Sequence, residues 1–198
     1  FHTTAAGLVV ITYNTSKVKP EDAPKKWEDL LDIKWKGKVS TGHPGFSGYV
    51  GTWVLSMKKL YGWQYFDKLE KNKPQIGRSI NDTVTALNAG ERQVAADADG
   101  STLFSAARGN PLAVSYPSDG SILIISPSAI MKGTKHPNAA KLFMEYLYTI
   151  EASKINAKHF GIPLRPEVPS PPGAKPISEI KVIRPTVAEV EKGIPDVI

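Results

Sequence analysis

The 198-residue sequence contains no cysteine, which excludes a disulfide scaffold and any metal site built from thiolates. Its charge is not gathered in blocks: the net charge is +6, yet no run of five Lys or Arg residues occurs. Long hydrophobic runs are also missing, because the longest, at Ile122 to Ile125, has the length of a strand. We therefore expect a chain that does not span a membrane and has no nucleic-acid partner.

The beginning of the sequence has neither a start methionine nor a signal peptide, since the first residue is Phe1. This indicates a processed, trimmed or partial chain, in which an export signal would be invisible. Hydrophobic residues make up 41% of the sequence and charged residues 22%. That balance is typical of an ordinary globular protein, and the length allows one or two domains with a buried core.

Strands and helices alternate through the first two thirds of the sequence. The hydrophobic pattern predicts strands at 7–14, 38–41, 93–97, 112–116 and 121–125, and helices at 25–32, 47–60, 63–72, 79–90 and through 108. Such alternation predicts an α/β sheet with parallel members. Further helices are expected at 136–149, 151–159 and 186–192, with a Pro-rich arm at 162–176. The helix at 136–149 carries an apolar band that includes Leu142 and Phe143, and the tryptophans, Trp63 among them, are expected in the core.

The most informative stretch is 36–59, where a short strand leads through a glycine-containing loop into a helix. Ser47 is a natural N-cap, and Gly48 leaves the backbone uncovered beside it. The first N–H groups of such a helix have no partner inside the helix, so they can bind an anion or another hydrogen-bond acceptor. Many helices of α/β proteins begin in this way and bind nothing, so the motif alone leaves both interpretations open.

Polar residues lie at three loops that lead into predicted helices. They are Ser47, Ser79 with Asn81, and the pair Asp97 and Asp99. In α/β sheets ligands bind beyond the carboxyl ends of the strands, so we predict that these residues meet at one cleft. Helix starts would donate hydrogen bonds there, Asp97 would supply charge, and Tyr13, Tyr49 or Tyr116 would pack against the solute.

The two aspartates allow several interpretations. They could be oxygen ligands of a metal ion, a counter-charge for a cationic group, or turn residues that cap the following helix. The four histidines show no spacing typical of a metal site, so metal binding stays undecided, and no cofactor is predicted.

An alternative function is a hydrolase in which Ser47 is the nucleophile. The strand–turn–helix context fits, and His136 and His159 lie downstream as that order requires. However, the nucleophile turn needs glycine two residues after the serine, where this sequence has Tyr49. Both histidines also lie at helix ends, where a structural role explains them. We therefore expect no enzyme activity.

Several segments resemble one known family in the same order along the chain. They are Gly7-Leu-Val-Val-Ile-Thr-Tyr-Asn-Thr15, Trp27-Glu-Asp-Leu-Leu-Asp32, Trp35-Lys-Gly-Lys-Val39, Leu87-Asn-Ala-Gly-Glu91, Tyr116-Pro-Ser-Asp-Gly120 and the stretch from Lys132 to Phe143. The sequence resembles the type II periplasmic solute-binding proteins of ABC importers, family 1, in the branch that serves ferric ion and thiamine. Each motif is weak alone, whereas the ordered set is specific and covers most of the chain.

The resemblance implies two α/β lobes joined by crossing strands, with a solute bound between them and a membrane permease as partner. Lobe 2 would comprise residues 12–118, and lobe 1 would comprise residues 1–11 and 119–198, without the family's opening βαβ portion. The adjacent tyrosines that bind ferric ion in this branch are absent, because 95–100 reads Ala-Ala-Asp-Ala-Asp-Gly. The resemblance therefore predicts a periplasmic protein that captures a small organic anion or zwitterion.

Overall fold

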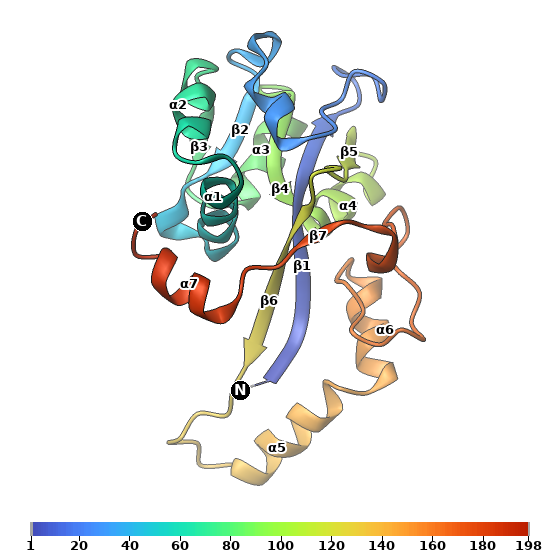
Figure 1. The fold of residues 1–198 in the computed structure, drawn as a ribbon. Helices are drawn as coiled ribbons and strands as arrows, with labels where there is room; N and C mark the ends of the chain where they lie inside the picture. Colours follow the sequence, from blue (N-terminus) through green and yellow to red (C-terminus); the bar gives the residue numbers. More distant parts are fainter. Residues whose placement is uncertain (1, 198) are drawn as a thin grey trace.

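A computed structural model describes residues 2–197, apart from the side chain of His2, and shows one mixed sheet with helices on both faces (Figure 1). Residues 1 and 198, the ends of the two segments predicted for lobe 1, lie outside the described part. The strands are β1 His2–Asn14, β2 Val39–Gly42, β3 Gln75–Gly77, β4 Val94–Ala98, β5 Leu112–Ser115, β6 Ser121–Ser128 and β7 Val182–Ile183. The α-helices are α1 Gly48–Tyr61, α2 Gln64–Lys71, α3 Asn81–Asn88, α4 Asp99–Ala107, α5 Pro137–Tyr146, α6 Ile150–Lys158 and α7 Val187–Gly193. Short 3₁₀ helices lie at Trp27–Leu31, Ile33–Trp35, Pro44–Phe46 and Ile177–Glu179.

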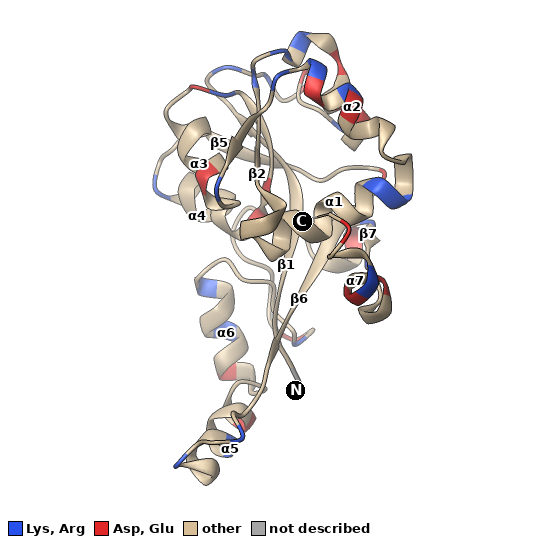
Figure 2. Cartoon of the chain, turned by 90° about the vertical axis from the view of Figure 1, so that its left-hand side faces the viewer, with Lys and Arg blue, Asp and Glu red and all other residues tan. Residues whose placement is uncertain are grey.

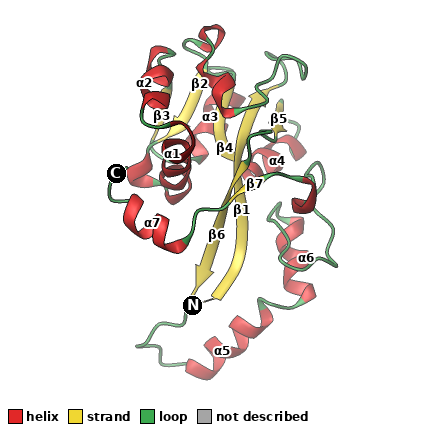
Figure 3. Cartoon of the chain, viewed as in Figure 1, coloured by secondary structure: helices red, strands yellow, loops and turns green. Residues whose placement is uncertain are grey.

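The strand order is β3-β2-β4-β1-β6-β7, and β5 pairs with β1 (Figure 3). Strands β2, β3 and β4 are parallel to one another, as the alternation of strands and helices predicts. Strand β1 is antiparallel to β4, β5 and β6. The α/β class is therefore confirmed, and the sheet is mixed because its central strand runs opposite to its neighbours.

The long strand β1 has two different surroundings. Its second half pairs with β4 from Val9 to Tyr13 and with β5 from Ile11 to Asn14. Its first half, from His2 to Leu8, has β6 as its strand partner in the described part of the chain. The sheet thus narrows to a two-stranded β1–β6 extension that projects from the body of the molecule (Figure 1).

The main core lies between the sheet and helices α1 and α2. Trp27, Trp53, Met57 and Tyr65 are completely or almost completely buried there. Helix α1 forms where predicted: the Ser47 hydroxyl accepts a hydrogen bond from Val50 N–H, and Gly62, at φ 74°, ends the helix. A smaller core joins Leu8 and Val10 of β1 to Ile162 and Ile180 of the C-terminal part.

Two expectations about the core are wrong. Trp63 is 46% exposed, because it precedes the first residue of α2 and stacks against Lys58 at the surface. Helix α5 has no buried residue, and its Leu142 and Phe143 are 69% and 60% exposed. The amphipathic pattern predicted the helix correctly, but no described segment covers its apolar side (Figure 1). No helix within residues 2–197 is both long and apolar enough to span a membrane.

Candidate ligand-binding site

Helices α1, α3 and α4 begin at the edge of the sheet where β2, β3 and β4 end. Gly42, the last residue of β2, lies between the first two of these helix starts. A Cβ added to Gly42 would lie 2.7 Å from the Val50 side chain and 2.9 Å from the carbonyl carbon of Ser79. The start of α1 and the segment that leads into α3 are therefore neighbours.

The first turns of α3 and α4 are joined by a side-chain hydrogen bond, because Ser101 Oγ donates to Asn81 Oδ1 at 3.0 Å. We call residues 47–49, 79–81 and 99–101 the helix-start cluster. Gly48 and Asn81 are exposed, and Ser47, Ser79 and Ser101 are partly exposed. The structure thus brings together, at the surface, the three helix starts that the sequence placed after strands.

Ser79 does not itself cap α3. The helix begins two residues later, at Asn81, and its N-cap residue Ile80 has no capping side chain. The Ser79 N–H instead donates to the Asp82 carboxylate at 2.9 Å, and the same carboxylate accepts from the Ser79 hydroxyl. These bonds lower the pKa of Asp82 and engage Ser79 within the protein.

Asp97 is the second-last residue of β4 and is completely buried. Its Oδ1 accepts from Ala98 N–H at 2.6 Å, whereas its Oδ2 has no hydrogen-bond partner among the described residues. Burial raises the pKa of Asp97 to about 8, although the hydrogen bond from Ala98 N–H lowers it by less. The carboxyl group has no surface open to solvent, and it is therefore set apart from the exposed part of the helix-start cluster.

Asp99 is the first residue of α4 and is 4% exposed. Its Oδ1 accepts from Leu8 N–H in β1 at 3.0 Å. Burial raises the pKa of Asp99 to about 6, while the bonds from Leu8 and Gly100 N–H lower it. The carboxylate thus connects the start of α4 to the central strand.

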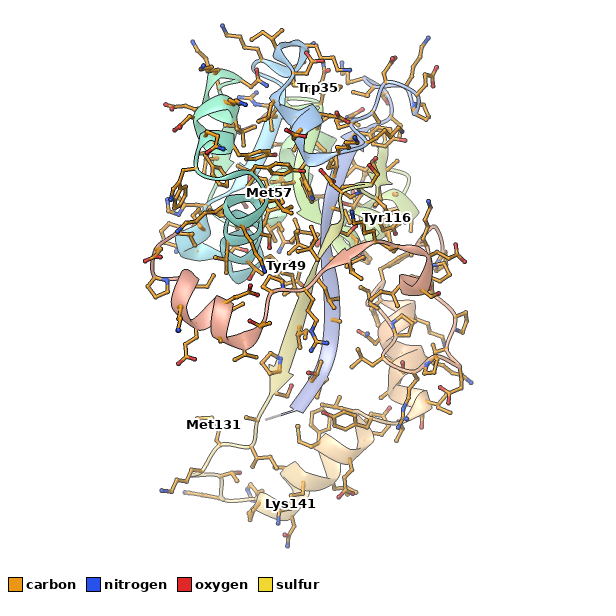
Figure 4. The ribbon with its side chains drawn as sticks, viewed as in Figure 1. Trp35, Tyr49, Met57, Tyr116, Met131 and Lys141 are labelled. Atoms are coloured by element: carbon orange, nitrogen blue, oxygen red, sulfur yellow. The ribbon has the colours of Figure 1, made fainter. Side chains whose placement is uncertain are left out.

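The three predicted tyrosines lie in different places, and Figure 4 shows Tyr49 and Tyr116. Tyr49 of α1 reaches β1, where its hydroxyl lies against Gly7. Tyr116 follows β5, and its hydroxyl accepts from Lys175 N–H at 3.2 Å. The charge of Asp99 raises the pKa of both, after a larger effect of burial. Tyr13 is separate: it pairs with Val94 at the far end of β4 and is 7% exposed in the main core.

The sequence analysis missed Arg78 and Ser101. Arg78 is exposed in the loop before α3, and its guanidinium lies 5.2 Å from the centre of the Phe46 ring, beside the start of α1. It therefore adds a positive charge between two helix starts. The sequence signal that could have identified Arg78 is its position directly before Ser79. Elsewhere Lys, Arg, Asp and Glu are interspersed along the chain (Figure 2).

The arrangement around Ser47 does not assemble a nucleophile and base. Its hydroxyl accepts from Val50 N–H as a helix cap, and no histidine bonds to it among the described side chains. His43, the nearest histidine in the sequence, accepts from Gly45 N–H with Nδ1. The described side chains, which begin at Thr3, also contain no group of three His, Asp or Glu residues arranged to hold a metal ion.

The fold is that of the type II periplasmic binding proteins. The structure of AfuA from Actinobacillus pleuropneumoniae with fructose 6-phosphate aligns with a TM-score of 0.82 at 24% identity, over 97% of this chain and 62% of AfuA. Iron-bound HitA from Pseudomonas aeruginosa aligns with a TM-score of 0.79 at 23% identity, over 98% of this chain and 68% of HitA.

Residues 1–183 match the model of the bacterial extracellular solute-binding proteins, and the chain belongs to this family. An uncharacterised Haemophilus influenzae protein is 26% identical over 153 residues, which are 75% of this chain and 44% of that protein. A Salmonella typhimurium protein, provisionally named a 2-aminoethylphosphonate-binding periplasmic protein, is 26% identical over 168 residues. These residues are 79% of this chain and 49% of that protein. The chain therefore spans about half the length of these relatives.

Proposed function

We propose that this chain is the solute-binding part of a bacterial ABC importer, which captures a small organic anion or zwitterion outside the cytoplasm and delivers it to a membrane permease. The observation that carries the proposal is the helix-start cluster in a chain of the solute-binding family. Binding would be an equilibrium without turnover, and the site of action would be the periplasm.

The chemistry of the cluster supports an anionic group on the solute. The starts of α1, α3 and α4 present the positive ends of three helix dipoles at one edge of the sheet. Arg78 adds a guanidinium, which suits the planar oxygens of a carboxylate or the oxygens of a phosphonate. Gly48 and Asn81 are the exposed contacts that we assign to the solute first.

The roles of the other predicted residues differ in this proposal. Ser47 caps α1 and orients its free N–H groups. Tyr49 and Tyr116 lie where residues 12–118 meet the rest of the chain, and we assign them to the boundary between two lobes. Asp97 and Asp99 support the cluster from inside the protein, because both are buried. We assign no solute contact to Tyr13 or Ser79.

Thermal-shift measurements and calorimetry test this proposal with four probes: 2-aminoethylphosphonate, fructose 6-phosphate, thiamine and ferric citrate. We expect one of the two phosphorus compounds to raise the melting temperature in proportion to the logarithm of its concentration, with no turnover detected by mass spectrometry. A rise with ferric citrate alone would contradict the assignment of an organic anion. Conversion of any probe to a product would favour the Ser47 hydrolase, particularly if Ser47→Ala abolished it.

A further inference from the structure

The sheet narrows at Leu8, and a side chain replaces a missing strand at that point. The last residue pair between β1 and β4 is Val9 with Ala98. Asp99 follows β4 but begins α4 instead of continuing the strand. Its Oδ1 nevertheless accepts a hydrogen bond from Leu8 N–H at 3.0 Å. Leu8 is 1% exposed, so its N–H would otherwise be buried without a partner. The Asp99 carboxylate thus supplies the acceptor that the departing strand no longer offers.

A second contact holds the same short segment of β1. Tyr49 reaches from α1 to Gly7, and a Cβ on residue 7 would lie 2.5 Å from the Tyr49 hydroxyl. The Tyr49 hydroxyl also lies near the Ser126 side chain of β6. Strand β1 is therefore fixed at residues 7 and 8 by one residue from α1 and one from α4. Below this point the two-stranded β1–β6 extension continues, with α6 beside it and α5 beyond its end (Figure 1).

Asp99 lies among groups that respond to its charge. After a larger effect of burial, its charge raises the pKa values of Tyr49 and Tyr116, and Asp97, whose carboxyl group burial keeps protonated below about pH 8, lies two residues before it. Lys175, from the Pro-rich arm, lines the same small cavity of about 30 Å³ as Asp99 and Leu8. A carboxylate forms a stronger hydrogen bond with N–H than a neutral carboxyl does. The bond to Leu8 therefore depends on the charge of Asp99.

We propose that Asp99 is a positioning residue at a joint: the hydrogen bond from Leu8 N–H to its carboxylate fixes the angle at which the β1–β6 extension leaves the sheet, and loss of that bond loosens the joint. This rests on the proposed function, because a solute held between two lobes requires a defined angle between them. Burial raises the pKa of Asp99 to about 6, so at pH 7.5 the group is charged and its bond to Leu8 N–H is charge-assisted.

The hydrogen-exchange protection factor of the Leu8 amide, measured by NMR without any solute, tests the bond directly. In the wild type at pH 7.5 we expect the Leu8 amide to be protected nearly as well as the amide of Val10, which is fully buried and pairs with β4 on the same strand. Asp99→Asn keeps a neutral acceptor, so its Leu8 protection relative to Val10 should lie between those of the wild type and Asp99→Ala. Asp99→Ala should lower protection about tenfold at pH 7.5. Asp32→Asn is the matched control, because Asp32 accepts one backbone N–H, from Lys34, at the surface.

The angle itself can be measured by pulsed electron spin resonance. The chain has no cysteine, so Lys71→Cys on α2 and Lys141→Cys on α5 give two unique labelling sites. At pH 7.5 we expect a narrow distance distribution for the wild type and a broader one for Asp99→Ala. Asp99→Asn should give an intermediate width, and so tests the proposal even if Asp99→Ala fails to fold. Equal widths for the wild type and Asp99→Asn, with unchanged Leu8 protection in Asp99→Asn, would overturn the proposal.

These readouts separate the joint from solute binding. If the chain bound none of the four probes but Leu8 protection followed the hydrogen-bond acceptor at residue 99, the joint would stand and the assigned solute class would fail. If 2-aminoethylphosphonate bound equally well to wild type and Asp99→Asn, and neither protection nor distance changed, solute binding would stand and the joint would fail.

Discussion

The Tyr49 hydroxyl and Gly7 are packed so closely that a side chain at residue 7 would require Tyr49 to move. A Cβ there would lie 2.5 Å from the hydroxyl oxygen and 3.3 Å from two ring carbons. Residue 7 is therefore glycine because of an aromatic residue 42 positions later in the chain, and not because of its own backbone conformation.

We predict that Gly7→Ala lowers the free energy of unfolding by about 1–3 kcal/mol through overpacking. Tyr49→Phe removes the nearest atom, so the same glycine substitution should cost less in the Tyr49→Phe background. Urea denaturation of the four proteins in this double-mutant cycle measures the coupling. Additive effects would contradict the direct contact.

The buried Asp97 makes stability depend on pH. Its pKa rises from 3.8 to about 8 on folding, so the folded state keeps a proton that the unfolded state loses. The free energy of unfolding should therefore fall as the pH rises from about 4 to about 8 and level off above that. Asp99 adds a decline of the same sign between about 4 and 6. At pH 8.5 Asp97→Asn should be more stable than the wild type by about 1–3 kcal/mol. Urea titrations at pH 5, 7 and 8.5 measure this, and a gain equally large at pH 5 would refute it.

Two glycines provide a matched pair for the ligand site. An added Cβ would meet no atom within 4 Å at either Gly48 or Gly133, so a larger side chain fits the fold at both. Gly48→Leu should cover the start of α1 and weaken binding of the active probe at least about tenfold, whereas Gly133→Leu should leave it unchanged. Calorimetry measures both affinities, and melting temperatures verify folding. Equal affinities would remove α1 from the site.

The uncovered side of α5 predicts self-association of the 198-residue chain. Leu142 and Phe143 are exposed, as is Met131 in the preceding loop, at 79%. Clustered apolar surface of this kind promotes association. The double variant Leu142→Lys with Phe143→Lys should sediment as a monomer at concentrations where the wild type associates, with a melting temperature close to that of the wild type. A large fall in the melting temperature would show instead that these side chains pack inside the protein.

Local signals were sufficient for α1 and for the class of the fold. The Ser47 cap and Gly62 determine the two ends of α1, and the apolar stripe predicts the helix between them. All three signals lie within or next to the helix. The parallel order of β2, β3 and β4 likewise follows from their connecting helices. The first residues of β1 could not be predicted in the same way. Thr3 to Ala6 are strand because they pair with β6, more than 100 residues away.

The candidate site was predictable in position but not in detail. The alternation of strands and helices placed Ser47, Asn81 and Asp99 at one edge of the sheet. The side-chain direction of Asp97 was not predictable, because it depends on which face of β4 each residue occupies: Ala96 and Ala98 belong to the main core. Helix α3 starts at Asn81, and the Asp82 carboxylate accepts a hydrogen bond from Ser79 N–H just before it. The sequence alone does not predict this contact between side chain and backbone.

Helix α7 covers one side of α1, although the two helices lie far apart in the sequence. Helix α7 packs against α1, where Lys59 and Glu189, 130 residues apart, form an ion pair and Gly193 lies against Leu55. During synthesis this side of α1 stays uncovered until the roughly 130 residues that separate Lys59 from Glu189 have left the ribosome. Contacts of such separation slow folding and leave apolar surface open to chaperones. This part of the native packing therefore forms only after α7 has been translated.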